Sequence, residues 1–375
     1  MEEEFKNSSS DSVLLYYTSE DKVLIKNNGK IEPSHWLELL RWWGNGEYID
    51  SETNQIIVSF DTYIQRRGWF KNNWRLKSRK VYVSEQLKNK IKEINQTRVN
   101  FEKALQLKSL FPENELEIKN IKRTLTKEQV YNVCSSLSVP SGANFSVPGA
   151  GKTTTTLTIW SHLLENNKVN KLLVICPKSA FEAWLETEPK ETFKIAPKTQ
   201  LFEKDIIRSD IKILVTNYEK LENQENLNNI YTWMLMNKVM MVLDEAHRVK
   251  GGGNSIRWQA CKKLSNKALR IEILTGTPMP QGYSDLKNLL NLSWNGLPRN
   301  FLSEDKIRSI RPGTIFVRTT KNQLQLPEVN FVEVPIIPSD IQSQIYSALK
   351  RSYIGTLNLS FSNKQYLAQR GVEIG

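Results

Sequence analysis

Cysteine and histidine are scarce in this sequence, with three residues of each kind in a chain of 375. Cys134, Cys176 and Cys261 lie far apart and form no Cys-x-x-Cys pair, which argues against a disulfide framework and a structural zinc site. The three histidines are equally scattered. We therefore expect reduced, mostly buried thiols and no metal site built from histidine and cysteine.

Long apolar runs are also missing from the chain. No uninterrupted apolar stretch approaches the roughly 18 residues that are needed to cross a bilayer. Residues 1–10 are acidic and rich in serine, so they lack the basic start and apolar centre of a signal peptide. We expect a cytoplasmic protein without a membrane partner.

Positive charge is what the sequence has in excess, with a formal net charge of +12. Such a surface attracts phosphate backbones regardless of their base sequence. A lysine-rich surface that only keeps the protein in solution is the alternative. The positions of the charges along the chain must decide between the two.

Composition and periodicity divide the chain into segments. Short apolar runs between Asn and Gly turns predict a small β-containing module with a helix around 36–40, and an amphipathic helix follows from Glu85. The segments are a disordered tail (1–12), an accessory α+β module (13–84), a helical connector (85–120), an α/β lobe (121–317) and a linker (318–375).

The α/β lobe shows short apolar runs that alternate with helical patterns. These runs are rich in Val, Ile, Leu and Met, which suits a parallel sheet that is covered on both faces. The predicted strands are 143–147, 171–176, 211–216, 239–243 and 270–274. The fold class is therefore α/β, preceded by the small α+β module.

A glycine-rich turn at 146–153 follows the first of these strands and opens a threonine-rich helix. Backbone N–H groups of such a turn surround a phosphate, while Lys152 reaches the β and γ oxygens of ATP and the Thr153 hydroxyl binds Mg²⁺. Ser146 stands where the strict motif has glycine, so the match is to its relaxed form. The predicted nucleotide contacts are Pro148, Gly149, Ala150, Gly151, Lys152, Thr153 and Thr154.

Two carboxylates end another predicted strand, because the apolar run 239–243 leads directly into Asp244 and Glu245. The carboxyl edge of a parallel sheet is where open α/β folds bind ligands. Asp244 is predicted to hold Mg²⁺, directly or through water, and Glu245 to orient or deprotonate the attacking water. A solvated strand end is the alternative, and the upstream phosphate loop argues against it.

Over about 124–349 the chain resembles the Swi/Snf-type ATPases of helicase superfamily two, whose ATP-binding lobe is RecA-like. Residues 244–250 match the family's extended "DEAHRIK" motif closely. Further segments are similar to family motifs in the family order, namely 173–179 with Trp184, 213–219, 274–279, 316–321 and 326–328. The resemblance implies an ATPase that acts on DNA.

The same resemblance implies roles for single residues. Gln129 is similar to the glutamine that reads adenine, although Thr126 and Gln129 also form a predicted capping box at a helix start. The residues expected to couple the nucleotide state to the grip on DNA are His247, Thr275, Gly276 and Thr277. A buried, hydrogen-bonded structural histidine is the alternative for His247. The residues expected near the nucleic-acid backbone are Lys178, Thr216 and Asn217, for which exposed loop-end positions are the alternative.

The family's Gln-x-x-Gly-Arg-x-x-Arg motif, whose arginine completes the ATP site, has no counterpart before Gly375. An arginine finger contributes about 10³ to 10⁵ in rate. We therefore expect this chain alone to bind ATP and hydrolyse it poorly, with a second RecA-like lobe supplied by a longer protein or by another chain.

A basic and aromatic segment, 66–80, lies in the accessory module and contains no acidic residue. Cations beside aromatic rings suit phosphate neutralisation and base stacking. The candidate DNA contacts are Arg66, Arg67, Trp69, Lys71, Trp74 and Arg75. The alternative is a hairpin, with its turn at 72–73, whose aromatic residues pack a small sheet.

Together these features predict a Mg-ATP-dependent translocase or helicase-like ATPase that prefers double-stranded DNA. A rival hypothesis is an ATP-dependent binding or regulatory module with little turnover. A small-molecule kinase is disfavoured, because the motifs of 244–247 and 275–277 lie in helicase order. For bacterial proteins of this type the resemblance also suggests a role in anti-phage defence.

Overall fold

The computed structural model describes residues 12–18, 22–28, 31–43, 48–50, 55–74, 79–107, 109–203, 206–249, 251–252, 255–297 and 301–324, with short stretches between 334 and 347. The chain divides into two compact units, Met1–Gln325 and Leu326–Gly375. None of the helices in the described ranges is long and apolar enough to cross a membrane. The predicted tail lies outside these ranges, apart from Ser12.

The accessory module contains a five-stranded sheet in the order β3-β4-β2-β1-β5. Its strands are β1 (Ser12–Tyr17), β2 (Lys22–Asn27), β3 (Tyr48–Asp50), β4 (Gln55–Ser59) and β5 (Lys80–Val83). All neighbours are antiparallel except β1 and β5, which are parallel. Side chains alternate along β4, where Ile56 and Val58 are buried, because one face of the sheet covers a core.

Helices close this small core. They are α1 (Pro33–Trp43), α2 (Phe60–Arg66) and a short π-helical turn, η2 (Phe70–Trp74). The predicted hairpin with its turn at 72–73 is therefore wrong. Phe70 and Trp74 are four positions apart, and both are buried on the same side of a helical turn rather than alternating along a strand.

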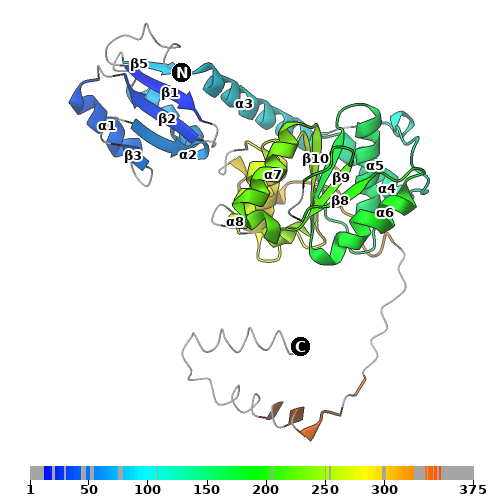
Figure 1. Cartoon of the computed structure of the whole chain (residues 1–375). Helices are drawn as coiled ribbons and strands as arrows, with labels where there is room; N and C mark the ends of the chain where they lie inside the picture. The colour runs from blue at the N-terminus through cyan, green and yellow to red at the C-terminus, as the bar shows by residue number, and fades with distance from the viewer. Residues whose placement is uncertain are drawn as a thin grey trace. The chain divides into compact units, whose positions relative to one another are not determined.

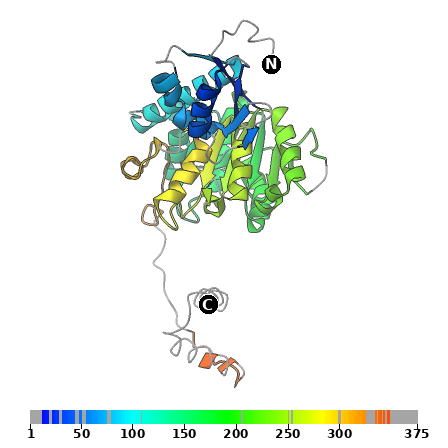
Figure 2. The same cartoon turned by 90° about the vertical axis from the view of Figure 1, so that its left-hand side faces the viewer.

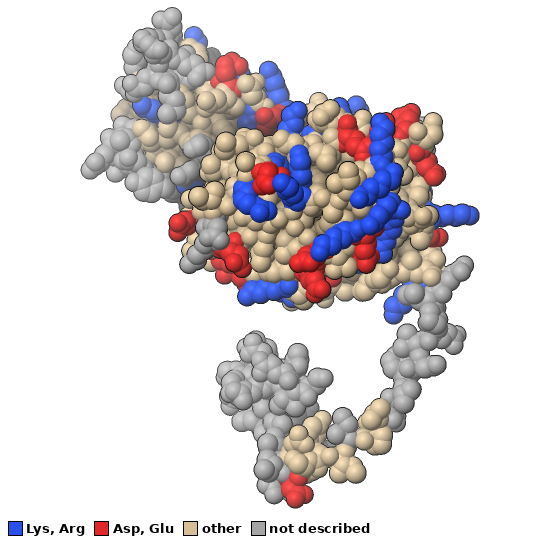
Figure 3. Space-filling model, turned by 45° about the vertical axis from the view of Figure 1, so that its right-hand side comes forward, with Lys and Arg blue, Asp and Glu red and all other residues tan. Residues whose placement is uncertain are grey.

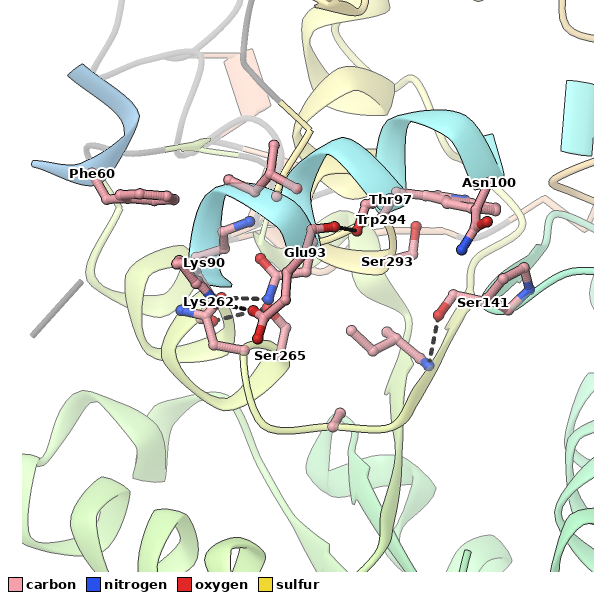
Figure 4. A pocket seen from close by; sticks show the side chains of 17 residues that line it. Phe60, Lys90, Glu93, Thr97, Asn100, Ser141, Lys262, Ser265, Ser293 and Trp294 are labelled. Atoms are coloured by element: carbon pink, nitrogen blue, oxygen red, sulfur yellow. Dashed lines mark hydrogen bonds and ion pairs between the residues drawn. The ribbon is translucent and has the colours of Figure 1, made fainter. Parts of the chain in front are cut away.

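Helix α3 (Glu85–Leu105) confirms the predicted amphipathic helix, and Ser84 caps its first turn. Leu87 and Ile94 belong to the core of the accessory module, whereas Phe101 belongs to a core of the α/β lobe. A polar cavity of about 200 Å³ lies beside α3, and Figure 4 shows the side chains that line it. The helix thus contributes to two hydrophobic cores.

The α/β lobe contains a six-stranded, all-parallel sheet in the order β6-β11-β10-β7-β9-β8. The strands are β6 (Gly142–Asn144), β7 (Lys171–Ile175), β8 (Thr199–Leu201), β9 (Ile213–Thr216), β10 (Val239–Asp244) and β11 (Arg270–Leu274). The α/β fold class is confirmed, and each of the predicted strands overlaps an observed one. The edge strand β8 was not predicted.

Helices cover both faces of this sheet (Figures 1 and 2). The helices of the lobe are α4 (Lys127–Leu137), α5 (Lys152–Glu165), α6 (Glu188–Thr192), α7 (Gln224–Leu235), α8 (Ile256–Ser265), α9 (Tyr283–Ser293) and α10 (Glu304–Arg308). Met241 and Leu243 of β10 belong to one core, and Met240 and Val242 belong to another. The central strand is therefore buried on both sides, which explains its unbroken apolar sequence. The three cysteines are buried, as predicted.

The segment after residue 315 adds to the edge of the sheet beside β6. The Phe145 N–H donates to the Val317 carbonyl at 2.8 Å, and the Val317 N–H donates to the Ala143 carbonyl at 2.8 Å. The Val147 N–H donates to the Thr319 carbonyl at 3.1 Å. These bonds join the first residues of the predicted linker to the sheet of the lobe.

Candidate nucleotide-binding and hydrolysis site

The loop between β6 and α5 has the geometry of a phosphate-binding turn. Gly149 and Gly151 adopt φ angles of 83° and 75°, in the left-handed region that favours glycine. Lys152 begins α5, and its Nζ donates to the carbonyls of Ser146 at 3.0 Å and Val147 at 3.4 Å. The lysine is therefore folded over the loop, beside N–H groups at a helix N-terminus that can receive phosphate oxygens.

Ser146 explains the departure from the strict motif. Its hydroxyl accepts a hydrogen bond from the Thr319 N–H at 2.8 Å, and its own N–H donates to the Asn144 side chain at 3.1 Å. Ser146 is fully buried. A glycine here would lack the side-chain oxygen that joins the phosphate loop to the segment around Thr319.

The threonines at the start of α5 differ in their surroundings. Thr153 is half-buried in the first turn, whereas the Thr155 and Thr156 hydroxyls donate to carbonyls one turn back. Thr154 is buried, and its hydroxyl accepts from Arg123 at 3.1 Å and donates to Glu188 at 2.9 Å. The Thr154 hydroxyl is thus engaged within the protein, and a nucleotide contact through the Thr154 backbone N–H stays a prediction.

Gln129 lies against the phosphate loop. The capping box with Thr126 is present, since each residue's side chain accepts from the other's backbone N–H. The Gln129 Nε2 also donates to the Ala150 carbonyl at 3.5 Å. A Cβ at Gly151 would lie 2.2 Å from this nitrogen, so the glutamine amide closely approaches the loop backbone. The predicted capping box is confirmed, while adenine recognition by Gln129 stays a prediction.

Asp244 ends β10 and is held on both carboxylate oxygens. Oδ2 accepts from the Trp184 Nε1–H at 2.8 Å, and Oδ1 accepts from the Glu245 N–H at 2.9 Å. The Tyr218 hydroxyl donates to the Asp244 carbonyl at 2.7 Å. Burial raises the pKa of the Asp244 carboxyl, and the nearby Lys152 ammonium opposes that shift.

Glu245 has a φ of 47°, in the left-handed region where a residue with a Cβ is uncommon. Its side chain is half-exposed. Such a conformation costs about 1–3 kcal/mol and is found at functional sites more often than elsewhere. This strained position directly follows Asp244, the last residue of β10.

The residues predicted to couple the site lie next to it. His247 Nδ1 is 3.2 Å from both the Glu245 carboxylate and the Thr275 hydroxyl. The Thr275 hydroxyl also accepts from the Thr277 N–H at 3.1 Å. A Cβ at Gly276 would contact the Pro148 ring at 3.4 Å, so this segment packs against the phosphate loop.

The predicted nucleic-acid contacts on the lobe are only partly accessible. Lys178 is exposed after β7, whereas Thr216 and Asn217 are 0% and 1% exposed. The Asn217 side chain accepts from the Lys220 N–H at 2.9 Å and so caps the following turn. Both side chains face the interior, and the expected place of Thr216 and Asn217 near a nucleic-acid backbone stays a prediction.

Similar corrections apply to the accessory module. Trp69 and Trp74 are 9% and 0% exposed, so they pack the core and do not offer rings for base stacking. The Arg66 guanidinium donates to the Trp42 carbonyl at 3.1 Å. Arg67 and Lys71 remain accessible, and Arg75 lies outside the described residues.

The donor set fits a magnesium ion that arrives with its nucleotide. Among the described residues, no group of three or more His, Cys, Asp or Glu side chains could hold a metal by itself. Mg²⁺ is usually bound through one or two protein oxygens together with substrate phosphates and water. The Thr153 hydroxyl and the Asp244 carboxylate are such oxygens, beside the phosphate loop.

A parallel sheet with a phosphate loop after one strand and an Asp-Glu pair after another defines a P-loop nucleotide-binding lobe. Residues 140–301 match the family model of the SNF2-related domain. This match lies within the segment, about 124–349, over which the sequence resembles the Swi/Snf-type ATPases.

Two curated relatives and one solved structure illustrate this similarity. The chromatin structure-remodeling complex subunit snf21 of Schizosaccharomyces pombe is 30% identical over 41% of this chain and 13% of its own length. The ATP-dependent DNA helicase DDM1 of Arabidopsis thaliana is 30% identical over 43% of this chain and 21% of its own length. The SWI2/SNF2 ATPase core of Sulfolobus solfataricus in complex with dsDNA is 23% identical, with a TM-score of 0.47, over 69% of this chain and 59% of that chain. The matched segment is thus a small part of each curated relative.

Proposed function

We propose that this chain is the first motor lobe of a Mg-ATP-dependent, helicase-like ATPase that translocates on duplex DNA. The observation that supports it best is the arrangement of β6, β11 and β10 as neighbouring parallel strands, so that the phosphate loop with Lys152, Thr275 and the Asp244-Glu245 pair lie at the same edge of the sheet. Sequence relatives described as chromatin remodellers and DNA helicases favour DNA as the activator. Cytoplasmic location and anti-phage defence stay predictions.

Each residue of the site has a distinct task in this proposal. The loop N–H groups and Lys152 bind the β and γ phosphates, and Thr153 with Asp244 would hold Mg²⁺. Mg²⁺ bound there neutralises charge that develops on the transferred phosphoryl group. Glu245 orients the attacking water and accepts its proton. A second RecA-like lobe, from the same protein or another chain, would complete the site.

His247 and Thr275 connect hydrolysis to DNA binding in this proposal. His247 lies within 3.2 Å of both Glu245 and Thr275, so a shift of the 275–277 segment moves a direct neighbour of the proposed base. Gly276 packs on Pro148 of the phosphate loop. The state of the phosphates can therefore be transmitted to this segment through contacts already present.

The basic residues do not form a continuous patch on the face that Figure 3 shows. Figure 3 shows Lys and Arg side chains mixed with Asp and Glu on the face in view. Lys119, Lys190 and Lys198 are exposed, and each forms an ion pair with a nearby carboxylate at 3.0, 2.9 and 2.8 Å. Part of the positive charge is thus neutralised locally, and surface lysines alone do not locate DNA.

The test is ATP turnover by the full-length protein with and without duplex DNA, using single-stranded DNA of the same length for comparison. Strong stimulation by the duplex supports the motor. Tight ATP binding without turnover under every condition would support a nucleotide-dependent switch instead.

Replacing Trp184 with phenylalanine should raise the Mg²⁺ concentration that ATP turnover requires, because the Asp244 carboxylate loses the hydrogen bond from the indole N–H that fixes it. A hydrogen bond to a charged group is worth about 1.5–3 kcal/mol, so we expect half-saturation at about tenfold higher Mg²⁺. The measurements are ATP affinity and ATP turnover as functions of Mg²⁺ concentration.

Trp160→Phe is the matched control. Trp160 is fully buried in the same core as Trp184, and its Nε1 has no hydrogen-bond partner among the described residues. Equal Mg²⁺ dependence in the two variants would assign Trp184 a packing role only.

A further inference from the structure

The accessory module contains a second cavity, of about 540 Å³, between the end of α2, strand β5 and the first half of α3. Its volume lies within the range of about 300–1,000 Å³ that is typical of small-molecule sites. The floor is apolar and is formed by Leu15, Tyr63, Phe70, Val81, Val83 and Ile91. Exposed Gly68 lies at its mouth.

The rim of this cavity is basic on two sides. Arg67 and Lys71 come from the end of α2 and from η2, while Lys88 and Lys92 come from α3. No acidic residue is among the described residues that line the cavity. Lys88 and Lys92 are four positions apart on α3, a spacing at which like charges on a helix repel each other by several tenths of a kcal/mol.

Local compensation of these charges is incomplete. Glu85 forms an ion pair with Lys88 at 2.6 Å, and its charge also acts on Lys92. Arg67 and Lys71 form no ion pair within the described part of the chain. An anionic ligand would therefore relieve repulsion that the protein itself leaves in place.

The polar cavity beside α3 (Figure 4) does not share these properties. Its Lys90 pairs with Glu93 at 3.2 Å, and its Lys262 donates to the Asn291 carbonyl at 2.8 Å. Both cations are thus engaged by the protein. Of these two cavities, the one in the accessory module combines an apolar floor with accessible cations, and the one in Figure 4 does not.

We propose that this cavity binds one nucleotide unit of a DNA strand, with the base against the apolar floor and its phosphates on the basic rim. Inorganic phosphate would make no contact with the apolar floor, and an apolar ligand would leave the cations of the rim without an anionic partner. The base must be unpaired, because a base inside a duplex exposes only its edges. The choice of DNA among phosphate-bearing ligands rests on the proposed function.

Gly68 allows a direct test of this site. A Cβ built at this position meets no atom within 4 Å, so a side chain is accepted at the mouth without a clash. Gly68→Glu places a carboxylate beside the bound phosphates, and Gly68→Gln places a neutral group of the same size there. The two variants differ in charge and not in bulk.

The experiment measures binding of a fluorescent dT 12-mer by the full chain without ATP. We expect Gly68→Glu to bind at least about tenfold more weakly than Gly68→Gln. Replacing Arg67, Lys71 and Lys92 with Gln should lower the slope of log affinity against log salt by up to about 1.4, from about 0.7 for each of the two phosphates that flank one nucleotide unit. The control variant carries Gln at Arg41, Lys80 and Lys103, which are exposed and lie outside the cavity. Its slope of log affinity against log salt should stay closer to that of the wild type.

Competition with dTMP and with a poly-glutamate peptide identifies the ligand. Displacement of the 12-mer by dTMP in a Lys152→Ala background shows that a single nucleotide unit suffices. Stronger displacement by poly-glutamate, or equal affinity of the two Gly68 variants, would overturn the proposal. If duplex DNA stimulates ATP turnover while the Gly68 variants bind the 12-mer equally, the proposed function stands and this site does not. If the variants differ as expected and duplex DNA has no effect on turnover, the site stands and the proposed function does not.

Discussion

Replacing Lys152 with alanine is expected to weaken ATP binding by about 100-fold or more while the fold survives. Hydrogen bonds to charged groups are worth about 1.5–3 kcal/mol each, and this lysine is the ammonium at the phosphate loop. Within the described ranges, the hydrogen bonds of its Nζ go to the carbonyls of Ser146 and Val147 in its own loop, so its removal leaves the cores untouched. Calorimetric titration with Mg-ATP measures the effect.

Lys212→Ala is the matched control for this variant. Lys212 is exposed and precedes β9, which lies four strands away from β6 and its phosphate loop in the sheet. It should bind ATP like the wild type. Wild-type affinity in a folded Lys152→Ala protein would refute the assignment of the phosphate loop.

Replacing Glu245 with glutamine should reduce turnover by about 10²–10⁴ and leave Mg-ATP binding unchanged. The amide keeps the size of the carboxylate and can still contact His247, but it cannot accept a proton from water. Turnover has to be measured with a second lobe present, because the first lobe alone is expected to hydrolyse ATP poorly.

Glu186→Gln serves as the control for Glu245→Gln. Glu186 is exposed and pairs with Lys190 on the surface, so the same chemical change there should have little effect on turnover. Unchanged turnover of Glu245→Gln in the assembled enzyme would remove Glu245 from the mechanism.

The sheet of the lobe was predictable because its strands are buried on both faces. Leu172, Leu173 and Val174 of β7, for example, form an apolar run that few other structures tolerate. Strand β8 was missed because its residues, Thr199–Leu201, are half-exposed and form a three-residue edge. Short edge strands carry little periodicity.

The aromatic segment of the accessory module shows the limit of pattern reading. Trp69 and Trp74 stand among cations, which is equally typical of a stacking surface and of a packed helical turn. Both rings meet neighbours from α1, since Trp42 stacks on Trp69 and His35 meets Trp74 edge to face. Sequence spacing inside the segment contains no information about those neighbours.

The motifs of the ATP site were predictable, whereas the contacts that orient them were not. Trp184 and Asp244 are separated by 60 residues, and their hydrogen bond requires the order in which the strands assemble. The same holds for Arg123 and Glu188 around Thr154. In the sequence, Trp184 is indicated only by its place in a segment similar to a family motif, and that similarity does not predict its hydrogen bond to Asp244.

The pairing of the segment around Thr319 with the edge of the sheet has a mechanical consequence. A force that pulls on the chain beyond Thr319 would act along the segment that pairs in parallel with residues 143–147. A force in this direction is shared by all of the hydrogen bonds between the two segments, so they do not open one by one. The load would then reach Ser146 and Val147 through their bonds to Thr319. Since the carbonyls of these same two residues hold the Lys152 ammonium, tension in this segment would displace the cation that meets the phosphates.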